Sequence, residues 1–503
     1  MNFNEANPSP ILVFAVGGPI GSGCSFVSNE LNHYLPSFGY EVETIDVTKV
    51  FLENIGQYLR EQNGSFSISD TLAHSSKPAE RIRYLQECGN QLRGRWGTEI
   101  IAALCVSEVI HPHIEKNDVL KTRKRQAYII DSLKHPDEVR FLRSVFQDAF
   151  CMVGVVATDR TRRKRLKEQK GFDEDAFRLI SKIDADEGGR DHGQKAIHAV
   201  VESDYFFAND SGQVKGIQDE ANRLVSLIFG TEVLTPSRDE FGMQAAYKAA
   251  AKSACLSRQV GAAILDTKGH VLATGHNDVP CFGGGLYNSG SESDERCYSR
   301  ARKCYSDEYK KRIVDQLLTG LKESGLLQVP PDKAEAVEKI VRDSGIKNLI
   351  EFSRAVHAEM EAIIGVGRTG GSGLVGSTLY CSTFPCHTCA KHIIAAGISK
   401  VVYLEPYEKS LARELHSDAI YDPLEQHNGK KAVFHTYGGV SPRRYDDYFR
   451  SEGDRKRNRV LERNRARTSL LPIGAQDSDE LYSRVRRVTE KVKEVTERVE
   501  TDK

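Results

Sequence analysis

The sequence lacks a net charge, a long apolar run and an internal repeat. Lysine and arginine together number 70, aspartate and glutamate also number 70, and the formal net charge of the 503-residue chain is zero. Such a balance argues against a polyelectrolyte that coats nucleic acid or an anionic membrane. The apolar run Ile11–Val16 is too short for a membrane span or a signal peptide, and no basic residue precedes it. We expect a cytoplasmic protein with no membrane partner.

Cysteine, in contrast, is well represented, with 11 residues. In a reducing cytoplasm, cysteines serve more often as buried thiols, metal ligands or redox groups than as a disulfide framework. A chain of 503 residues is also too long for one ordinary core, so we expect two or three domains.

Short β-rich runs alternate with longer amphipathic stretches, which predicts an α/β fold. The first series of runs has the rhythm of βα units on a parallel sheet and ends before the segment TPSRDE at 235–240. A second series begins with an alanine-rich helix near residue 241 and is interrupted by an insertion at 281–350. The predicted domains are 1–235 and 236–440, followed by a charged tail at 441–503.

The tail is dense in charge up to residue 467, and we expect that part to be flexible or to depend on a partner. The spacing of apolar residues beyond it is that of a short heptad seam in a coiled coil. These residues are Leu481, Val485, Val488, Val492, Val495 and Val499. A helix that packs onto its own domain explains the spacing equally well.

The clearest chemical pattern is HAE at 357–359 followed by PCHTC at 385–389. It matches the H-x-E and P-C-x-x-C signature of zinc nucleobase deaminases. One imidazole, from His357, and two thiolates, from Cys386 and Cys389, would leave the fourth tetrahedral position of Zn²⁺ open for water. The metal would make that water acidic enough to attack C4 of cytosine near neutral pH. Glu359 would carry the proton from the water to the ring nitrogen and then to the leaving amine.

A structural zinc knuckle is the alternative interpretation of the cysteine pair. The added His357 and Glu359 and the strand expected at 378–382 count against it, and three ligands rather than four favour an open, catalytic site. His387 and His392 could be proposed as a fourth ligand, but we interpret both as surface or supporting histidines.

Residues from about 240 to 437 resemble the deoxycytidylate deaminase family of the cytidine deaminase-like superfamily. The strings SRQVGAAIL, GHNDVP, HAEMEAI and LYCSTFPCHTCAKHIIAAGISKVVYLEP occur in the order and spacing of that family. The resemblance implies an α/β/α sandwich with a mixed sheet, hydrolytic deamination of dCMP or dCTP, and assembly into a homo-oligomer. It also assigns Asn277 and Arg258 to substrate binding.

The segment at 406–416 follows the end of a predicted strand, where ligand-binding groups gather in α/β sheets. Its Lys409, Arg413 and His416 could hold the phosphates of a nucleotide. A solvated helix face is an equally good interpretation of the same charges.

The turn GPIGSGCS at 18–25 follows the first strand-like run and precedes a helix-like one, which is the position of a phosphate-binding Walker A loop. Its glycines would let backbone N–H groups approach phosphates, and Ser25 would bind Mg²⁺. These glycines are Gly18, Gly21 and Gly23. Cys24 takes the place of the usual lysine, so the sequence predicts nucleotide binding more strongly than phosphoryl transfer.

The rest of the first domain resembles P-loop nucleotide and nucleoside kinases. Asp131 ends a strand-like run in a Walker B-like position, and Arg162 and Arg163 stand where such kinases carry an arginine-rich lid. Arginine suits phosphate because its rigid donors bind two oxygens at once. We predict that the domain binds a nucleoside triphosphate with Mg²⁺, and the alternative for the two arginines is a solvated helix end.

A kinase-like domain ahead of a deoxycytidylate deaminase-like domain resembles the bacterial two-domain anti-phage dCTP deaminases. That resemblance implies that infection switches on the conversion of dCMP or dCTP to dUMP or dUTP, which starves phage DNA synthesis. It also implies an inhibitory partner, such as a small RNA, that holds the enzyme off beforehand. Two alternatives stand beside it: a polynucleotide or tRNA deaminase with the same zinc signature, and a nucleotide-binding regulator that acts through its N-terminal domain.

Overall fold

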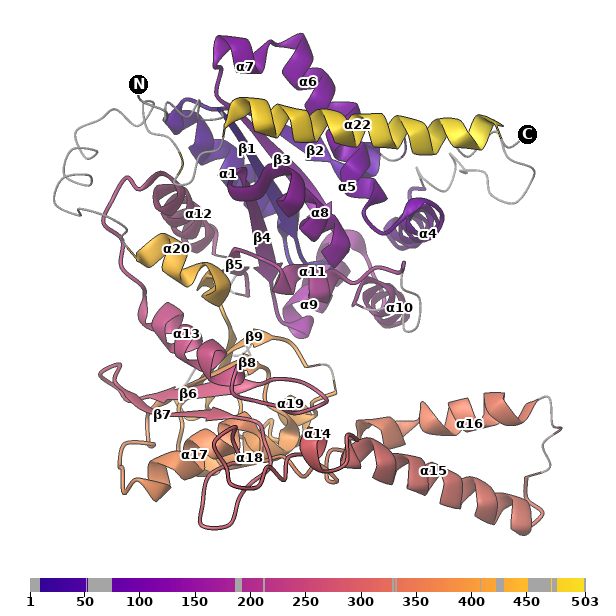
Figure 1. Cartoon of the computed structure of the whole chain (residues 1–503), viewed down its shortest axis with the longest axis vertical. Coiled ribbons are helices and arrows are strands. Elements are labelled where there is room, and N and C mark those ends of the chain that lie inside the picture. The colour runs from indigo at the N-terminus through magenta and orange to yellow at the C-terminus, as the bar shows by residue number, and fades with distance from the viewer. Residues whose placement is uncertain are drawn as a thin grey trace. The chain divides into compact units, whose positions relative to one another are not determined.

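The structure is a computed structural model of the chain. It describes residues 10–50, 52, 75–185, 192–210, 213–327, 330, 333–407, 409–421, 429–450, 472 and 477–501. Contacts group the chain into two compact units, Met1–Glu240 with Thr436–Lys503, and Phe241–His435 (Figure 1). The domain limits expected at 235 and 440 stay predictions, and the charge-dense segment 451–467 lies outside the described residues.

The first unit is built around a six-stranded sheet in the order β11-β5-β4-β1-β3-β2. Strands β1 to β5 pair in parallel, as the sequence predicts for this part of the chain, and β11 pairs antiparallel with β5. The strands are β1 (Ile11–Gly17), β2 (Glu41–Asp46), β3 (Gln126–Leu133), β4 (Phe150–Val156), β5 (Tyr205–Ala208) and β11 (Gly439–Val440).

Helices cover both faces of this sheet. Alternate residues of β1 point to opposite faces, so Val13 and Ala15 lie in one core cluster and Phe14 and Val16 in another. Helices α4, α5 and α8 contribute to the first cluster, and α1 and α12 contribute to the second. The helices are α1 (Cys24–Tyr34), α4 (Pro78–Trp96), α5 (Ile100–Leu104), α6 (His111–Lys116), α7 (Val119–Thr122), α8 (Pro136–Phe146), α9 (Asp159–Lys170), α10 (Glu174–Ala185), α11 (Ala196–Val201), α12 (Val214–Phe229), α20 (Tyr445–Phe449) and α22 (Ser478–Thr501).

Helix α22, yellow in Figure 1, accounts for the apolar spacing of the tail. Leu481, Val485, Val488 and Val492 lie in the core cluster that α5 and α8 also form, and the helix packs against α5, α6 and α8. Val495, further along, is 39% exposed. Of the two interpretations of the spacing, the structure therefore shows the helix packed onto its own unit.

The second unit contains a five-stranded mixed sheet in the order β10-β9-β8-β6-β7. Strand β6 is antiparallel to β7 and β8, and β8 is parallel to β9. The α/β fold with a mixed sheet is thus confirmed. The strands are β6 (Gly261–Leu265), β7 (Val271–His276), β8 (Thr378–Thr383), β9 (Lys400–Glu405) and β10 (Val433–Thr436).

The insertion adds a helical arm to this unit, formed mainly by α15 and α16. The helices are α13 (Arg238–Ala250), which begins at the boundary of the units, α14 (Cys297–Arg300), α15 (Tyr305–Glu323), α16 (Ala334–Arg342), α17 (Ala358–Arg368), α18 (His387–Ala395) and α19 (Ala412–Leu415). In the part of the chain that the structure describes, no helix is both long enough and apolar enough to cross a membrane.

Glycine at position 275 lets α17 lie directly on β7. A Cβ atom on Gly275 would lie 2.1 Å from the carbonyl oxygen of Ala358 and 2.5 Å from the backbone nitrogen of Ala362. Neither distance is compatible with a side chain, so the helix can approach the strand this closely only over a glycine. Because Ala358 begins α17, this contact fixes where the helix starts.

We expect Gly275→Ala to destabilise the second unit, because the added methyl group would collide with the backbone of α17. Overpacking of this kind lowers the free energy of unfolding by about 1–3 kcal/mol or more. Thermal unfolding of the full chain measures the effect.

Gly367→Ala is the matched control, since Gly367 lies on the exposed side of the same helix and a Cβ there meets nothing within 4 Å. Alanine has the higher helix propensity, by up to about 1 kcal/mol, so this variant should be as stable as the parent or slightly more so. Equal melting temperatures for the two variants would contradict the packing argument.

Candidate active site

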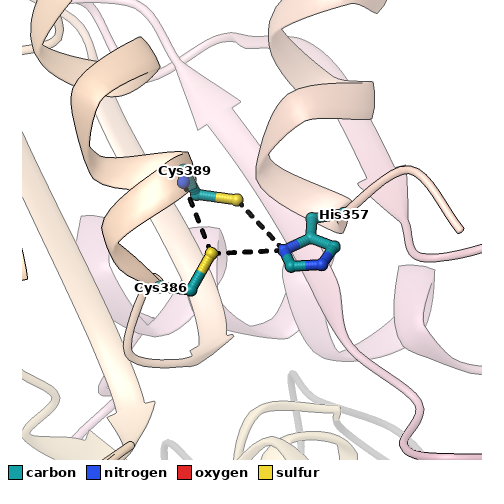
Figure 2. A group of neighbouring side chains, drawn as sticks. All are labelled: His357, Cys386 and Cys389. Atoms are coloured by element: carbon teal, nitrogen blue, oxygen red, sulfur yellow. Dashed lines mark hydrogen bonds between the residues drawn. The ribbon is translucent and has the colours of Figure 1, made fainter. Parts of the chain in front are cut away.

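Three potential metal ligands meet at the starts of two helices. His357 is the N-cap residue of α17, Cys386 is the N-cap residue of α18, and Cys389 lies in the first turn of α18. The Nδ1 atom of His357 lies 3.3 Å from the Sγ atom of each cysteine (Figure 2). Among the described residues, no other group of three or more histidine, cysteine or carboxylate side chains brings its donor atoms close enough to share a metal ion.

The local backbone explains why the two sulfur atoms converge. Cys386 and Cys389 are three residues apart at a helix start, and the backbone N–H of Cys389 donates to the Sγ atom of Cys386 at 3.4 Å. Residues with this spacing face the same side of a helix. The positive end of the helix dipole also favours a thiolate there.

Hydrogen bonds among His357, Cys386 and Cys389 shift the pKa values of all three side chains. A hydrogen bond with Cys389, together with the neighbouring His357, lowers the pKa of the Cys386 thiol to about 4. The hydrogen bond to Cys386 in turn raises the pKa of His357 to about 9, whereas Cys389, hydrogen-bonded to Cys386 and buried, has its pKa raised well above the usual value.

The donor set fits Zn²⁺. A zinc ion binds thiolates and neutral imidazole, so it can take the place of the protons that these donors share. Three protein ligands leave one tetrahedral position for a water or substrate, which is the arrangement of catalytic rather than structural zinc sites. His387 and His392 are not part of the group, and the Nδ1 atom of His392 lies 2.7 Å from the carbonyl oxygen of Thr388.

Glu359 lies beside the three candidate ligands, in the first turn of α17. Glu359 is only 4% exposed, and burial raises the pKa of its carboxyl group. Glu359 lines the same cavity as His357 and Cys386, which has a volume of about 730 Å³. A buried carboxyl group next to a metal site can both hold and release a proton, which is the requirement for general acid/base catalysis.

Three of the residues predicted to bind substrate line this cavity, namely Asn277, Arg258 and Lys409. The side chain of Asn277 accepts a hydrogen bond from the backbone nitrogen of Val260 at 2.7 Å and donates to the carbonyl oxygen of Arg258 at 2.8 Å. The side chain of Asn277 therefore fixes the segment that precedes β6 at the wall of the cavity. The guanidinium group of Arg258 pairs with Glu405.

Arg413 and His416 are not brought to the cavity lining. The guanidinium group of Arg413 donates to the carbonyl oxygens of Tyr421 at 3.2 Å and Phe434 at 2.9 Å, and lies over the ring of Phe384. These contacts hold three segments of the chain together, so the position of Arg413 indicates a structural role.

The insertion supplies a wall of the cavity that the sequence reasoning did not assign. Tyr305, Lys310 and Lys311 from α15 line it, as does Arg354, which follows the insertion. One signal was available in the sequence: the chain leaves for the insertion just after Asn277 and returns just before His357. Since both of these residues belong to the site, the two ends of the insertion have to lie beside it.

The glycine-rich loop of the first unit lies between β1 and α1. Gly21 and Gly23 have positive φ angles, 82° and 99°, and a Cβ on Gly18 would lie 2.4 Å from the carbonyl oxygen of Val155. The hydroxyl of Ser25 donates to the Oδ2 atom of Asp131 at 2.7 Å. The structure thus brings together the loop serine and the aspartate of β3.

The two predicted lid arginines take part in ion pairs on α9. Arg162 pairs with Asp159, and Arg163 pairs with Asp159 and Glu174. Neither lines the cavity of about 810 Å³ beside the loop. Other basic residues line it instead, among them Arg165, from the same arginine-rich segment, and Lys134, which the sequence reasoning did not name.

Comparison with known proteins gives a match for the second unit. Residues 236–405 match the family model of the cytidine and deoxycytidylate deaminase zinc-binding region. The chain is 29% identical over 168 residues to the deoxycytidylate deaminase of Enterobacteria phage T4, and the alignment covers 33% of this chain and 78% of that protein. It is 28% identical over 206 residues to the deoxycytidylate deaminase of Saccharomyces cerevisiae, with 40% and 46% covered.

A solved structure is also similar to this part of the chain. The crystal structure of the dCMP deaminase from the cyanophage S-TIM5, in complex with dCMP and dUMP, shares 20% sequence identity. The alignment covers 41% of this chain and 99% of that chain, with a TM-score of 0.23.

The three-ligand geometry predicts that His357→Ala and Cys389→Ala will each lose bound zinc. Removing one of three ligands leaves too few donors for a stable site, so the purified variants should hold much less zinc than the parent chain. Elemental analysis of the full chain measures the zinc content. Cys281→Ser is the control, because Cys281 lies outside the group and donates to the carbonyl oxygen of Gly284. Loss of zinc from Cys281→Ser but not from Cys389→Ala would refute the assignment.

Proposed function

We propose that this chain is a zinc-dependent hydrolase that deaminates deoxycytidine nucleotides, dCMP or dCTP, because residues 236–405 match the family model of the cytidine and deoxycytidylate deaminase zinc-binding region. The products are the deoxyuridine nucleotide and ammonia. The observation that carries the proposal is the position of Glu359, buried in one cavity with His357 and Cys386 and next to Cys389.

The reaction needs a nucleophilic water and a group that moves protons. A bound Zn²⁺ supplies Lewis acidity that makes water nucleophilic near neutral pH. His357, Cys386 and Cys389 would hold the ion. Glu359 accepts one proton from the attacking water and delivers it to ring N3 of cytosine. It then accepts the second proton of that water, from the hydroxyl group now on C4, and delivers it to the departing amino group as the C4–N bond breaks. One water enters and one ammonia leaves, so Glu359 returns to its starting state.

The environment of Glu359 supports this two-way role. Burial raises the pKa of its carboxyl group, while the positive charge of His357 opposes that shift. A carboxyl group whose pKa lies nearer to neutrality can hold a proton during one step and release it in another. An exposed carboxylate would hold its proton too weakly for the second transfer.

The walls of the cavity support a phosphorylated substrate. Lys409 and the insertion residues Lys310 and Lys311 place cationic side chains along them. Phosphate oxygens form charge-assisted hydrogen bonds with such groups. A nucleoside without phosphate would leave these cations without that interaction, so we propose that nucleotides are preferred.

The wider role follows from the resemblance of the whole chain to two-domain anti-phage deaminases. We propose that deamination depletes deoxycytidine nucleotides in the cytoplasm during phage infection, with a homo-oligomer as the active form and a small RNA as inhibitor. The first unit would bind a nucleoside triphosphate with Mg²⁺. The hydrogen bond of Ser25 with Asp131 and the cavity beside the loop support that binding role.

Glu359→Gln should abolish deamination while the chain keeps its zinc, because the amide is nearly isosteric but cannot carry the proton. Loss of a general acid/base typically lowers kcat about 10²- to 10⁴-fold. Ammonia release from dCMP, dCTP, CTP and single-stranded DNA measures the activity, and phage protection is scored in parallel.

Glu361→Gln is the matched control on the same helix. Glu361 pairs with Arg368 at 2.9 Å, so its loss should leave kcat close to the parent value. Activity on DNA alone would favour a polynucleotide deaminase. Phage protection that survives in Glu359→Gln would favour a regulator that acts through the first unit.

Lys409→Ala and Arg413→Ala should have different effects, because only Lys409 lines the cavity. Removing a charge-assisted contact with phosphate should raise KM for the nucleotide about tenfold or more and leave KM for deoxycytidine nearly unchanged. Arg413→Ala should instead lower the melting temperature, because its two carbonyl partners lose their hydrogen bonds. If Lys409→Ala changes KM equally for nucleotide and nucleoside, Lys409 does not contact phosphate.

A further inference from the structure

The loop between β1 and α1 lacks a cation where phosphate-binding loops carry lysine. Cys24 stands at that position, and burial raises the pKa of its thiol to about 11, so the side chain stays neutral. The N-cap residue of α1, Gly23, provides no side-chain hydrogen bond to the helix start. The first N–H groups of a helix have no acceptor within it, so they favour an anion at this point.

Lys134 brings an amine to the loop from another strand. It directly follows β3, which pairs with β1. Its Nζ atom donates to the carbonyl oxygen of Gly18 at 2.8 Å and lies 2.8 Å from the Oδ1 atom of Asp184. The amine of Lys134 therefore lies at the start of the loop, although its backbone is more than a hundred residues away in the sequence.

Asp184, near the end of α10, holds a negative charge against the same loop. Its residue is 1% exposed, and its Oδ2 atom accepts a hydrogen bond from the backbone nitrogen of Ile20 at 2.7 Å. One carboxylate thus engages a loop N–H group and a lysine amine together. These are the two kinds of donor that phosphate-binding loops offer to phosphate oxygens.

Further basic side chains line the cavity beside this pair. Lys170 and Arg81 line it together with Lys134, and burial together with the like charges of Arg81 and Lys134 lowers the pKa of Lys170. Arg165 also lines the cavity and donates to the carbonyl oxygens of Ser22 at 3.3 Å and Asn209 at 2.7 Å, which are uncharged acceptors. Like charges gathered around one cavity favour the binding of an anion.

An unused acceptor in the same cavity points to more than a simple anion. Gln86 is 4% exposed, and its Oε1 atom has no hydrogen-bond partner among the described residues. Its Nε2 atom donates to the carbonyl oxygen of Ile180 and to the side chain of Gln194. A buried acceptor without a donor is costly, and an N–H or O–H group of a bound nucleoside would satisfy it.

We propose that Lys134 supplies the phosphate-binding cation that the loop lacks at Cys24, and that a nucleoside polyphosphate binds by displacing the Asp184 carboxylate from Lys134 and from the N–H of Ile20. The inference rests on the nucleotide-binding role proposed for the first unit and names the residues that carry it. Asp184 competes with phosphate for the same donors, so its negative charge lowers the affinity of the loop for a nucleoside polyphosphate.

Binding of Mg·ATP and of inorganic tripolyphosphate to the full chain, measured by calorimetry, tests the proposal. Lys134→Ala should weaken both ligands about tenfold or more, because a charge-assisted contact with phosphate is lost. Asp184→Asn should tighten both, because it removes the competing charge while keeping the shape of the side chain. Lys167→Ala is the control, since Lys167 is an exposed lysine on α9 outside the cavity lining.

Lys134→Ala leaves the buried charge of Asp184 without its lysine, so the single variant can fail to fold. The double variant Lys134→Ala with Asp184→Ala removes both charges and should fold. It should bind tripolyphosphate about tenfold or more weakly than Asp184→Ala alone, because these two variants differ only in Lys134. Equal binding by these two variants, or weaker binding by Asp184→Asn than by the parent chain, would overturn the role of Lys134 and Asp184. If the parent chain binds neither ligand, the nucleotide-binding role of the first unit fails as well. Deamination of dCMP by the same samples reports on the second unit separately.

Discussion

The contact between α17 and β7 over Gly275 is the constraint on which the chemistry of the second unit depends. The carbonyl group of Ala358 occupies the space that a Cβ on Gly275 would need. Ala358 stands between His357 and Glu359 in the sequence, so the residue that touches the sheet is flanked by a proposed metal ligand and by the proposed proton carrier. No side chain lies between the sheet and this segment, and therefore no change of rotamer can move it. The sheet itself sets the position of both reactive residues.

Helix starts carry the reactive groups in both units, but a cysteine behaves differently in each. Cys24 begins α1 and Cys386 caps α18, so both stand where the helix dipole favours negative charge. Burial dominates for Cys24 and raises its pKa, whereas hydrogen bonds with Cys389 and His357 dominate for Cys386 and lower its pKa. The dipole alone does not decide whether a thiol ionises. Neighbouring groups that hydrogen-bond to the thiol decide it, and they favour the thiolate of Cys386, which suits the proposed metal site, while Cys24 stays neutral.

The sequence predicted what is local and missed what depends on partners far along the chain. The α/β fold and the convergence of Cys386 with Cys389 could be anticipated, because strand periodicity and the spacing of these two cysteines act within one element. Lys134 could not be found from the loop motif, since it reaches the loop only through the pairing of β3 with β1. The sequence allowed either a phosphate ligand or a solvated helix face for Arg413. Its hydrogen-bond partners in the structure, the carbonyl groups of Tyr421 and Phe434, follow from no local pattern.

The insertion shapes one wall of the cavity separately from the group formed by His357, Cys386 and Cys389. Its two ends are held together by the backbone hydrogen bond from the nitrogen of Val356 to the carbonyl oxygen of Asp278, at 2.9 Å. These residues adjoin His357 and Asn277, so the ends are fixed beside the site whatever the arm beyond them does. His357, Cys386, Cys389 and Glu359 lie at the starts of helices supported by the sheet, whereas α15 of the insertion contributes only wall residues to the cavity. Changes within the arm can therefore alter the shape of the cavity while these four residues stay in place.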